Sequence, residues 1–418
     1  MTSALRRRFL AFAVLLMWPA VRPTLAQQQE EVKGSVAEPS DAAEVRKQIA
    51  EVEKLQSNGF PDRAATLFFL AAAKQHLGET LDALKLLKEC IALRAGFDPS
   101  GEPAFRALKE SKEFTELVQN ARRDFPAVTK ARIAFVTEEK DLVPEGLAYD
   151  AKQDVFYLSS LNRRKIVKIA QNGKASDFVP ADRDHLLPVL GIRLDPLDGS
   201  IWANCFADRG VTELVHYDAA GTLLGRYTSK DSAKHGFNDL VVRKNGDVIV
   251  TDSLDNAVLR FDRKTSSFAR LPLHRAIFYP NGIALADDDQ QLFVADALGV
   301  VRVDLATGAS ADVNPGPRCT LAGFDGMYWY KEGLVGVQNG IGSPRVAAFR
   351  LAADGLSVKQ SAILEYRSQQ TVLPTTGAIH GNDFYFIANS QIDNLNDDKV
   401  LDATRLERIR IAVAHLPW

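Results

Sequence analysis

The sequence predicts a mainly β protein, in which a six-bladed β-propeller over residues 130–418 follows a small α-helical domain. Two observations predict the propeller. After Pro126 helical apolar spacing gives way to short runs rich in Val, Ile, Phe, Tyr and Leu between Gly, Asp and Asn clusters, which indicates many short antiparallel strands. One phrase then recurs six times at intervals of roughly 43 to 51 residues, the spacing of four-stranded propeller blades.

The recurring phrase is the first strand of each blade. Its copies are EGLAYD from Glu145, LGIRLD from Leu190, NDLVVR from Asn238, NGIALA from Asn281, DGMYWY from Asp325 and TGAIHG from Thr376. Each copy is followed by a turn and a second strand, such as VFYLSS or LFVADA. Residues 132–137 precede the first copy. We predict that they supply the outer strand of the last blade, which closes the ring and removes its exposed edges.

The first 26 residues predict a secretory signal peptide. Three arginines at positions 6–8 precede an apolar run from Phe9 to Val21, and Thr24 and Ala26 are small residues where a signal peptidase cleaves. The alternative is an uncleaved anchor helix, although the run is short for a membrane span. We therefore expect a periplasmic or secreted protein with no membrane contact after cleavage.

Residues 27–42 are polar without periodicity and predict a flexible leader, and residues 43–125 predict helices. The second and third helices resemble a single degenerate tetratricopeptide repeat at Leu67, Leu70, Ala71, Gly78, Ala83 and Leu87, with a plain helical bundle as the alternative. One repeat cannot bury its apolar face alone. We therefore expect this helix pair to dock on neighbouring helices or on the rest of the chain, and the tetratricopeptide-like domain is also a candidate to bind a protein partner.

Charge and cysteine content exclude several classes of protein. The formal net charge is −2 and no basic stripe occurs, so we expect no binding of nucleic acid. The chain has 3 cysteines with long separations, which does not make a disulfide framework. Whether Cys205 and Cys319 form a disulfide is left open.

The residue that opens each recurring phrase is expected at one mouth of the central channel, because the first strand of every blade lines the channel. These residues are Glu145, Leu190, Asn238, Asn281, Asp325 and Thr376. Two carboxylates, two amides and a hydroxyl would thus converge. Oxygen donors suit a hard divalent cation, and the two carboxylates would balance its charge. The set contains no Cys or His, which argues against a zinc site of the thiolate or imidazole kind.

These polar residues have an alternative interpretation. Asn-Gly and Asp-Gly pairs are also ordinary turn signals, so Asn281 could serve a turn or the packing of a blade.

A second polar set lies at the ends of the second strands and is expected to accept hydrogen bonds from backbone donors at turns. It comprises Asn204, Asp252, Asp296 and Asn389. His235 is expected to be a solvated loop residue.

Four motifs occur in the order and spacing of one family: PEGLAYD, FNDLVVRKNGDVIVTDS, YPNGIALADDDQQLFVADA and FDGMYW. Over residues 132–413 the chain resembles the regucalcin/gluconolactonase family of six-bladed propellers, which hold one divalent metal in the channel. The resemblance implies that Glu145, Asn281 and Asp325 bind the metal. It also implies that Asn238 contacts the substrate or the water on the metal, and that Asp325 is the catalytic base. The expected metal is calcium, with magnesium, manganese or zinc as alternatives, and no other cofactor is expected.

Two functions follow from these expectations. The first is an exported, metal-dependent hydrolase whose small-molecule substrate is a lactone or a similar ester. The second is a non-enzymatic binding or scaffold propeller, with a structural metal and a helical domain that docks a protein partner. The resemblance also assigns an arginine to the hydroxyls of a sugar substrate, and Arg193 is the candidate by its position in the blade.

Overall fold

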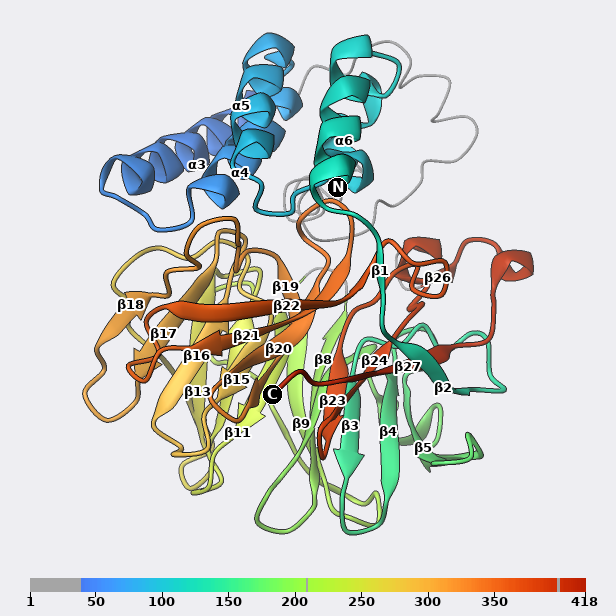
Figure 1. The fold of residues 1–418 in the computed structure, drawn as a ribbon. Coiled ribbons are helices and arrows are strands. Elements are labelled where there is room, and N and C mark those ends of the chain that lie inside the picture. Colours follow the sequence, from blue (N-terminus) through green and yellow to red (C-terminus); the bar gives the residue numbers. More distant parts are fainter. Residues whose placement is uncertain (1–38, 208–209, 397–398) are drawn as a thin grey trace.

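The computed structural model describes residues 39–207, 210–396 and 399–418, so the predicted signal peptide and most of the predicted leader lie outside the described residues. Helices come first and strands follow, as expected (Figure 1). The helices are α3 (Pro39–Ser57), α4 (Arg63–His76), α5 (Thr80–Ala92) and α6 (Lys112–Asp124), with short 3-10 turns at Pro99–Gly101 and Pro103–Leu108. Helix α3 begins inside the segment predicted as leader, because Pro39 suits the first turn of a helix, where its missing N–H costs nothing.

The strands form six antiparallel four-stranded blades, which confirms the six-bladed propeller. Blade 1 contains β3 (Leu147–Asp150), β4 (Val155–Ser160), β5 (Lys165–Ala170) and β6 (Ala175–Val179). Blade 2 contains β7 (Val189–Leu194), β8 (Ile201–Ala207), β9 (Val211–Tyr217) and β10 (Leu223–Tyr227). Blade 3 contains β11 (Phe237–Val242), β12 (Val248–Asp252), β13 (Ala257–Asp262) and β14 (Ser267–Arg270).

The remaining blades follow the same strand order, except that blade 5 gains a fifth strand and the outer strand of blade 6 comes from the start of the propeller. Blade 4 contains β15 (Ile283–Leu285), β16 (Gln291–Ala295), β17 (Val300–Asp304) and β18 (Ser310–Asp312). Blade 5 contains β19 (Phe324–Tyr330), β20 (Gly333–Gln338), β21 (Arg345–Leu351) and β22 (Val358–Tyr366), and β1 (Val128–Thr129) pairs with its outer edge. Blade 6 contains β23 (Gly377–His380), β24 (Asp383–Ile387), β27 (Arg410–His415) and β2 (Arg132–Val136). A two-stranded insertion, β25 (Leu395–Asn396) and β26 (Lys399–Val400), lies between β24 and β27, flanked by 3-10 turns at Ile392–Asn394 and Ala403–Arg405.

The ring closes between the two ends of the propeller sequence. Strand β2 pairs antiparallel with β27, with Arg132 opposite Val413 and Val136 opposite Arg410. The outer strand of blade 6 therefore comes from the start of the propeller and its three inner strands from the end. This pairing confirms the predicted closing strand, and it leaves β27 with a neighbour on both sides.

Six apolar clusters hold the blades to one another, and each cluster joins the facing surfaces of two neighbouring blades. Between blades 2 and 3, for example, Trp202 and Leu214 pack with Phe237 and Phe261. Between blades 6 and 1, Ile387 and Ile411 pack with Phe156. Because alternate residues of every strand face the next blade, burial is distributed evenly around the ring.

The glycines of the recurring phrase explain why the innermost strands can lie so close together. A Cβ on Gly146 would lie 2.3 Å from the carbonyl oxygen of Leu190, and one on Gly282 would lie 2.5 Å from that of Asp325. A Cβ on Gly191 would lie 2.7 Å from the carbonyl oxygen of Asn238. These three glycines therefore permit close approach of the next blade and do not mark hairpin turns.

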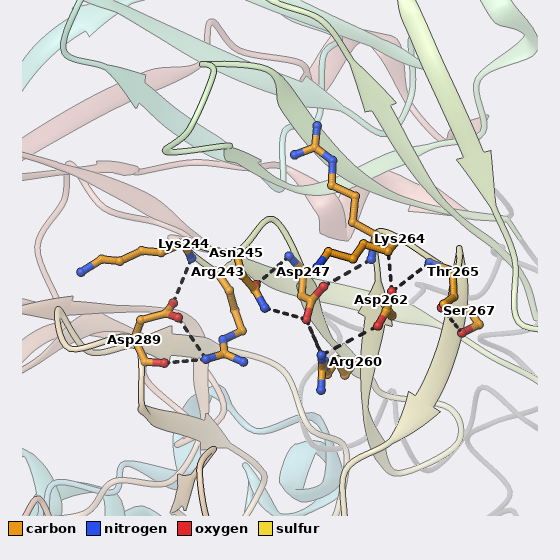
Figure 2. Close-up of polar contacts among 11 residues, drawn as sticks. Arg243, Lys244, Asn245, Asp247, Arg260, Asp262, Lys264, Thr265, Ser267 and Asp289 are labelled. Atoms are coloured by element: carbon orange, nitrogen blue, oxygen red, sulfur yellow. Dashed lines mark hydrogen bonds and ion pairs between the residues drawn. The ribbon is translucent and has the colours of Figure 1, made fainter.

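Polar contacts fasten the turns at the opposite end of the blades (Figure 2). Arg243, after β11, donates to the backbone oxygen of Asp289 at 2.8 Å and to its carboxylate at 3.0 Å, which joins blade 3 to blade 4. Within blade 3 the Asp247 carboxylate accepts two hydrogen bonds from Arg260, at 2.9 and 2.6 Å. These charged pairs lie at the end of the blades opposite to the mouth where the predicted site residues gather.

The helical domain packs on the propeller and buries its apolar face there. One cluster joins Leu67, Phe68 and Phe105 of the helical domain to Ala322 and Ile341 of blade 5. A second cluster joins α3 and α4 to Phe278 and Leu298 of blade 4. Docking on the rest of the chain is therefore confirmed, whereas the likeness to a tetratricopeptide repeat stays a prediction.

Two further features agree with the sequence. All three cysteines are free, and Cys205 lies in blade 2 whereas Cys319 precedes blade 5. In the described part of the chain, no helix has the length and apolar character needed to cross a bilayer.

Gly282→Ala tests the close approach of the blades. The added Cβ would meet the Asp325 backbone, so we expect the free energy of unfolding to fall by about 1–3 kcal/mol, the usual cost of overpacking. The matched control is Gly299→Ala, whose Cβ would meet only Phe60 at 3.7 Å, and we expect a change of less than about 0.5 kcal/mol. Urea denaturation of both variants measures this, and equal stabilities would contradict the close approach.

Candidate functional site

The six residues that open the recurring phrase lie at the same end of the innermost strands. Glu145 and Asn281 come just before β3 and β15, and Asn238 and Asp325 are the second residues of β11 and β19. The innermost strands pack in a closed ring in the order β3, β7, β11, β15, β19 and β23. The predicted site residues therefore surround one mouth of the channel.

Glu145 and Asp325 are buried and close enough to influence each other's ionisation. Burial raises the pKa of Glu145 well above its usual range, and the negative charge of Asp325 raises it further, while a hydrogen bond with Ser390 opposes both. Burial also raises the pKa of Asp325 to about 7, against hydrogen bonds from Asn339 and Asn281. The first and fifth blades thus bring two carboxylates together across the channel, as the sequence predicted.

Three buried oxygens at this mouth accept no hydrogen bond from any residue that the structure describes. They are Oε1 of Glu145, Oδ1 of Asn281 and Oδ1 of Asn339. A buried oxygen without a donor costs about 1–3 kcal/mol, so three of them in one place require a physical explanation. Carboxylate and amide oxygens that lack protein donors are the ligands that calcium and other hard divalent cations take. The donor set around Glu145, Asn281 and Asp325 therefore fits such a cation.

The charge of the site fits a divalent cation as well. Asp239, next to Asn238, is buried and its negative charge also raises the pKa of Asp325. Arg193 donates to the Asp239 carboxylate at 2.8 Å and supplies one positive charge. When Glu145, Asp239 and Asp325 are ionised, two negative charges are left in excess in a buried place, which a divalent cation would balance.

Asn238 lies at the mouth, half-buried, and its side chain reaches toward blade 4. Its Nδ2 donates to Oγ of Ser253 at 3.0 Å, and that hydroxyl donates to the backbone oxygen of Pro280 at 2.7 Å. The amide is thereby fixed beside the segment that carries Asn281. Its contact to a substrate or to water stays a prediction.

Two of the six positions contribute no free oxygen to the site. Leu190 is apolar, and the Thr376 hydroxyl donates to the backbone oxygen of Glu145 at 2.9 Å. The Thr376 hydroxyl thus lies beside Glu145 at the mouth and holds its backbone. Thr376 closes the ring between blades 6 and 1 at the site itself.

Two site residues were missed in the sequence. Asn339 donates from Nδ2 to the Asp325 carboxylate at 2.6 Å, and it follows β20 where Ser253 follows β12. The residue directly after the second strand of a blade could therefore have been predicted to reach the site from its position in the repeat. Tyr279 precedes the Pro-Asn-Gly motif; burial and then the charges of Asp325 and Glu145 raise the pKa of its phenol, which hydrogen-bonds with Ser253. Neighbouring sequence gives no sign that Tyr279 faces the site.

Arg193 is held inside the channel by protein groups. Besides Asp239 it contacts Tyr328, whose ring centroid lies 4.6 Å from the guanidinium carbon, and the Tyr328 hydroxyl accepts from the backbone N–H of Gly377 at 2.8 Å. Arg193 and Tyr328 each lie three residues beyond the mouth position of their strand, Leu190 and Asp325. The arginine therefore braces three blades below the site.

Three members of the second polar set, Asp252, Asp296 and Asn389, accept hydrogen bonds from backbone N–H groups, as predicted. Asn204 does not, since its Nδ2 donates to the backbone oxygen of Asp239 at 3.1 Å and its Oδ1 accepts no hydrogen bond from any described residue. Asp252 accepts from the backbone of Gly236 and Asp255, and Asp296 accepts from that of Phe278, Leu298 and Gly299. His235 is not solvated as expected, since it is buried and its Nδ1 and Nε2 contact Asp252 and Asp231. In the described part of the chain His235, Asp252 and Asp255 form a group with metal-ligand spacing. Hydrogen bonds within the protein already occupy its carboxylate and imidazole, so this group fits a metal less well than the channel mouth does.

Comparisons with known proteins show no family for this chain. No family model and no curated protein matches the chain. Among solved structures, it is similar to the gluconolactonase XC5397 from Xanthomonas campestris, with 17% identity, 70% of this chain and 98% of that chain covered, and a TM-score of 0.47. It is also similar to a PQQ-bound aldose sugar dehydrogenase from Streptomyces coelicolor (14% identity, 69% and 99% covered, TM-score 0.49) and to a luciferin-regenerating enzyme (15% identity, 66% and 92% covered, TM-score 0.47). Their names describe different reactions, so no activity follows from these likenesses.

The raised pKa of Asp325 predicts how the metal-free protein responds to pH. A carboxyl with a folded pKa of about 7 and an ordinary unfolded value of 3.8 binds its proton more tightly in the folded chain. The free energy of unfolding should therefore fall as the pH rises from about 4 to about 7. At pH 8 with a chelator, the free energy of unfolding of Asp325→Asn should exceed that of the parent by on the order of 1–3 kcal/mol, so the variant should unfold at a higher temperature, and at pH 4 the difference should vanish.

The control for this prediction is Glu332→Gln in the same blade. Its carboxylate is exposed and paired with Arg350 at 2.6 Å, so its removal should bring no gain in stability at pH 8. Thermal unfolding of the three proteins at both pH values measures the effect. A parent that is as stable as Asp325→Asn at pH 8 would contradict the burial of charge at the channel mouth.

Proposed function

We propose that the propeller is a metal-dependent hydrolase that opens a lactone or a similar ester at the channel mouth. The observation that carries the proposal is the pair of unpartnered oxygens, Oε1 of Glu145 and Oδ1 of Asn281, beside the buried carboxylate of Asp325. These three residues would hold the cation, and calcium suits an all-oxygen site with two carboxylates. A bound cation would polarise the carbonyl of the substrate and make water more acidic.

The residues of the chain then have separate roles. Asp325, oriented by Asn339 at 2.6 Å, takes a proton from water while the water oxygen forms a bond to the carbonyl carbon. The ring C–O bond of the lactone breaks, and the proton passes to the leaving oxygen. Asn238, fixed by Ser253, offers its amide to the substrate. Glu145 would supply negative charge to the cation, which would favour the ionised form against the burial and the Asp325 charge that raise its pKa.

The proposal includes export, because the predicted signal peptide directs the chain to the periplasm or out of the cell. Magnesium, manganese and zinc are alternatives to calcium. Magnesium is the less suitable of the hard cations, because it demands near-ideal octahedral geometry and keeps several waters. The substrate class rests on the resemblance in sequence and on the oxygen-rich site.

The alternative is a binding propeller with a structural metal and a partner-docking helical domain. The helical domain buries its large apolar face on blades 4 and 5, so that face is not available to a partner. Asn339 orients the Asp325 carboxylate at 2.6 Å, and a positioned carboxylate beside the proposed cation supports a hydrolase. The hydrolase is therefore the function that we put forward.

Turnover by the metal-loaded protein tests the proposal. Purified protein is stripped with EDTA and assayed on aldonolactones and aryl esters, with and without added calcium, magnesium, manganese or zinc. We expect turnover that EDTA abolishes and calcium restores. Asp325→Asn should lower kcat by at least about 100-fold, the usual contribution of a positioned base, and Glu145→Gln should weaken calcium binding about 10-fold or more.

Glu332→Gln, with its exposed carboxylate on the same blade, should leave kcat and calcium affinity unchanged. A parent that turns over none of these substrates with any of the metals would refute the hydrolase. Calcium binding that Glu145→Gln abolishes, without turnover by the parent, would establish the structural alternative.

A further inference from the structure

The helical domain and the candidate site lie at the same end of the propeller. Figure 1 shows α3 to α6 over one end of the blades. The loops that the helices contact include residues 278, 298, 321, 322 and 341, and these loops lead into or out of the same strand ends that carry Asn281, Asp325 and Asn339. The docking surface and the site therefore share loops.

The first shared loop leads into Asp325 and is bound by Asp62. This residue is 2% exposed, and its Oδ1 accepts from the backbone N–H of Ala65, which caps α4. Its Oδ2 accepts from the Thr320 hydroxyl at 2.7 Å and from the backbone N–H of Leu321 at 3.1 Å. The Asp62 carboxylate thus caps the N-terminus of α4 with one oxygen. With the other oxygen it binds Thr320 and Leu321, a few residues before Asp325.

The same loop is bound from the propeller side. Gln338 donates from Nε2 to the backbone oxygens of Thr320 at 3.1 Å and Ala322 at 2.7 Å, and its Oε1 accepts from Arg345. The next residue is Asn339, which donates to Asp325. Residues 320–322 are therefore fixed between Asp62 and Gln338, one residue away from the group that orients the Asp325 carboxylate.

The second shared loop carries Tyr279 and Asn281. Phe278 packs into the cluster of α3 and α4, with its ring centroid 5.6 Å from that of Phe69. Tyr279, the next residue, has φ of 52° and turns its phenol toward the site. A positive φ costs a non-glycine residue about 1–3 kcal/mol and persists only where the surroundings hold it. The propeller holds this backbone through Asn256, which accepts from the Tyr279 N–H at 2.8 Å, and the helical domain adds the packing of Phe278.

The third shared loop follows Asn339 and touches the helical domain through its backbone. The Asp98 N–H donates to the backbone oxygen of Ile341 at 3.4 Å, and a Cβ on Gly342 would lie 1.9 Å from the backbone oxygen of Asp98. Ile341 is fully buried in the cluster with α4 and α5. Each of the three loops that carry the fourth- and fifth-blade site residues is thus bound by the helical domain.

We propose that Asp62 is a positioning residue of the candidate site, which makes the helical domain a structural part of the metal site and not a detachable partner-binding module. Asp62 acts through Thr320 and Leu321 on the position of Asp325. The metal part of this inference rests on the proposed function, whereas the positioning of the loop does not.

Asp62→Asn tests the inference. The amide oxygen can still cap α4, but the NH₂ group that replaces Oδ2 cannot accept from Thr320 and Leu321. We expect amide exchange across residues 320–325 to become about 10-fold faster and the calcium Kd to rise about 10-fold, as for the loss of other groups that orient metal ligands. Hydrogen–deuterium exchange and isothermal titration of the full chain with calcium measure both.

Two sets of controls separate positioning from a general loss of stability. Ser111→Ala removes the cap of α6, whose hydroxyl accepts from Phe114 at 3.4 Å, and should lower the melting temperature without changing exchange at 320–325 or the Kd. From the propeller side, Thr320→Val should act like Asp62→Asn, whereas Thr320→Ser keeps the hydroxyl and should restore the parent Kd to within about twofold. The threonine pair decides the question if Asp62→Asn does not fold.

The outcomes distinguish this inference from the proposed function. Unchanged exchange at 320–325 in a folded Asp62→Asn or Thr320→Val variant overturns the positioning role, whatever the metal does. An equal effect of Ser111→Ala on the Kd also overturns it. A parent that binds no divalent cation refutes the proposed function, and the exchange of residues 320–325 then decides the positioning role alone.

Discussion

Closure of the ring is the constraint on which the rest of this protein depends. The pairing of β2 with β27 joins segments almost 280 residues apart and fixes six blades around one axis. In that closed ring the innermost strands lie so close together that a Cβ on Gly146 or Gly282 would collide with the backbone of the next blade. The glycines make the approach possible, and the approach brings the polar residues of different blades within reach of one another.

The electrostatics of the channel mouth follow from this geometry. Closure buries Glu145, Asp325 and Asp239 in one place, and Arg193 supplies an opposite charge to Asp239. A buried carboxylate without a counter-charge is unfavourable, and its pKa rises in response. The same arrangement leaves the oxygens of Asn281 and Asn339 without donors.

The helical domain meets the propeller where the site residues are carried. Its two apolar clusters and the Asp62 carboxylate all act on loops of blades 4 and 5, whereas Glu145 and Asn238 belong to blades that the helices touch less. The site residues of blades 4 and 5 are therefore held partly by the helical domain, whereas Glu145 and Asn238 are held by contacts within the propeller. The helical domain buries apolar surface on the propeller, and its contacts hold three loops of blades 4 and 5.

The sequence alone determined the blade number, the closing strand and the meeting of Glu145, Asn281 and Asp325, because a repeat of fixed period places equivalent residues at one depth of a closed ring. It determined the helices too, except that α3 begins at Pro39. Only the tertiary structure decided the partners across blades: that Thr376 holds the Glu145 backbone, that His235 is buried, and that Asn339 and Tyr279 belong to the site. These contacts join residues far apart in sequence, and the loops that carry them vary in length from blade to blade. The repeat predicts positions that all blades share, whereas these contacts are made by residues that differ from blade to blade.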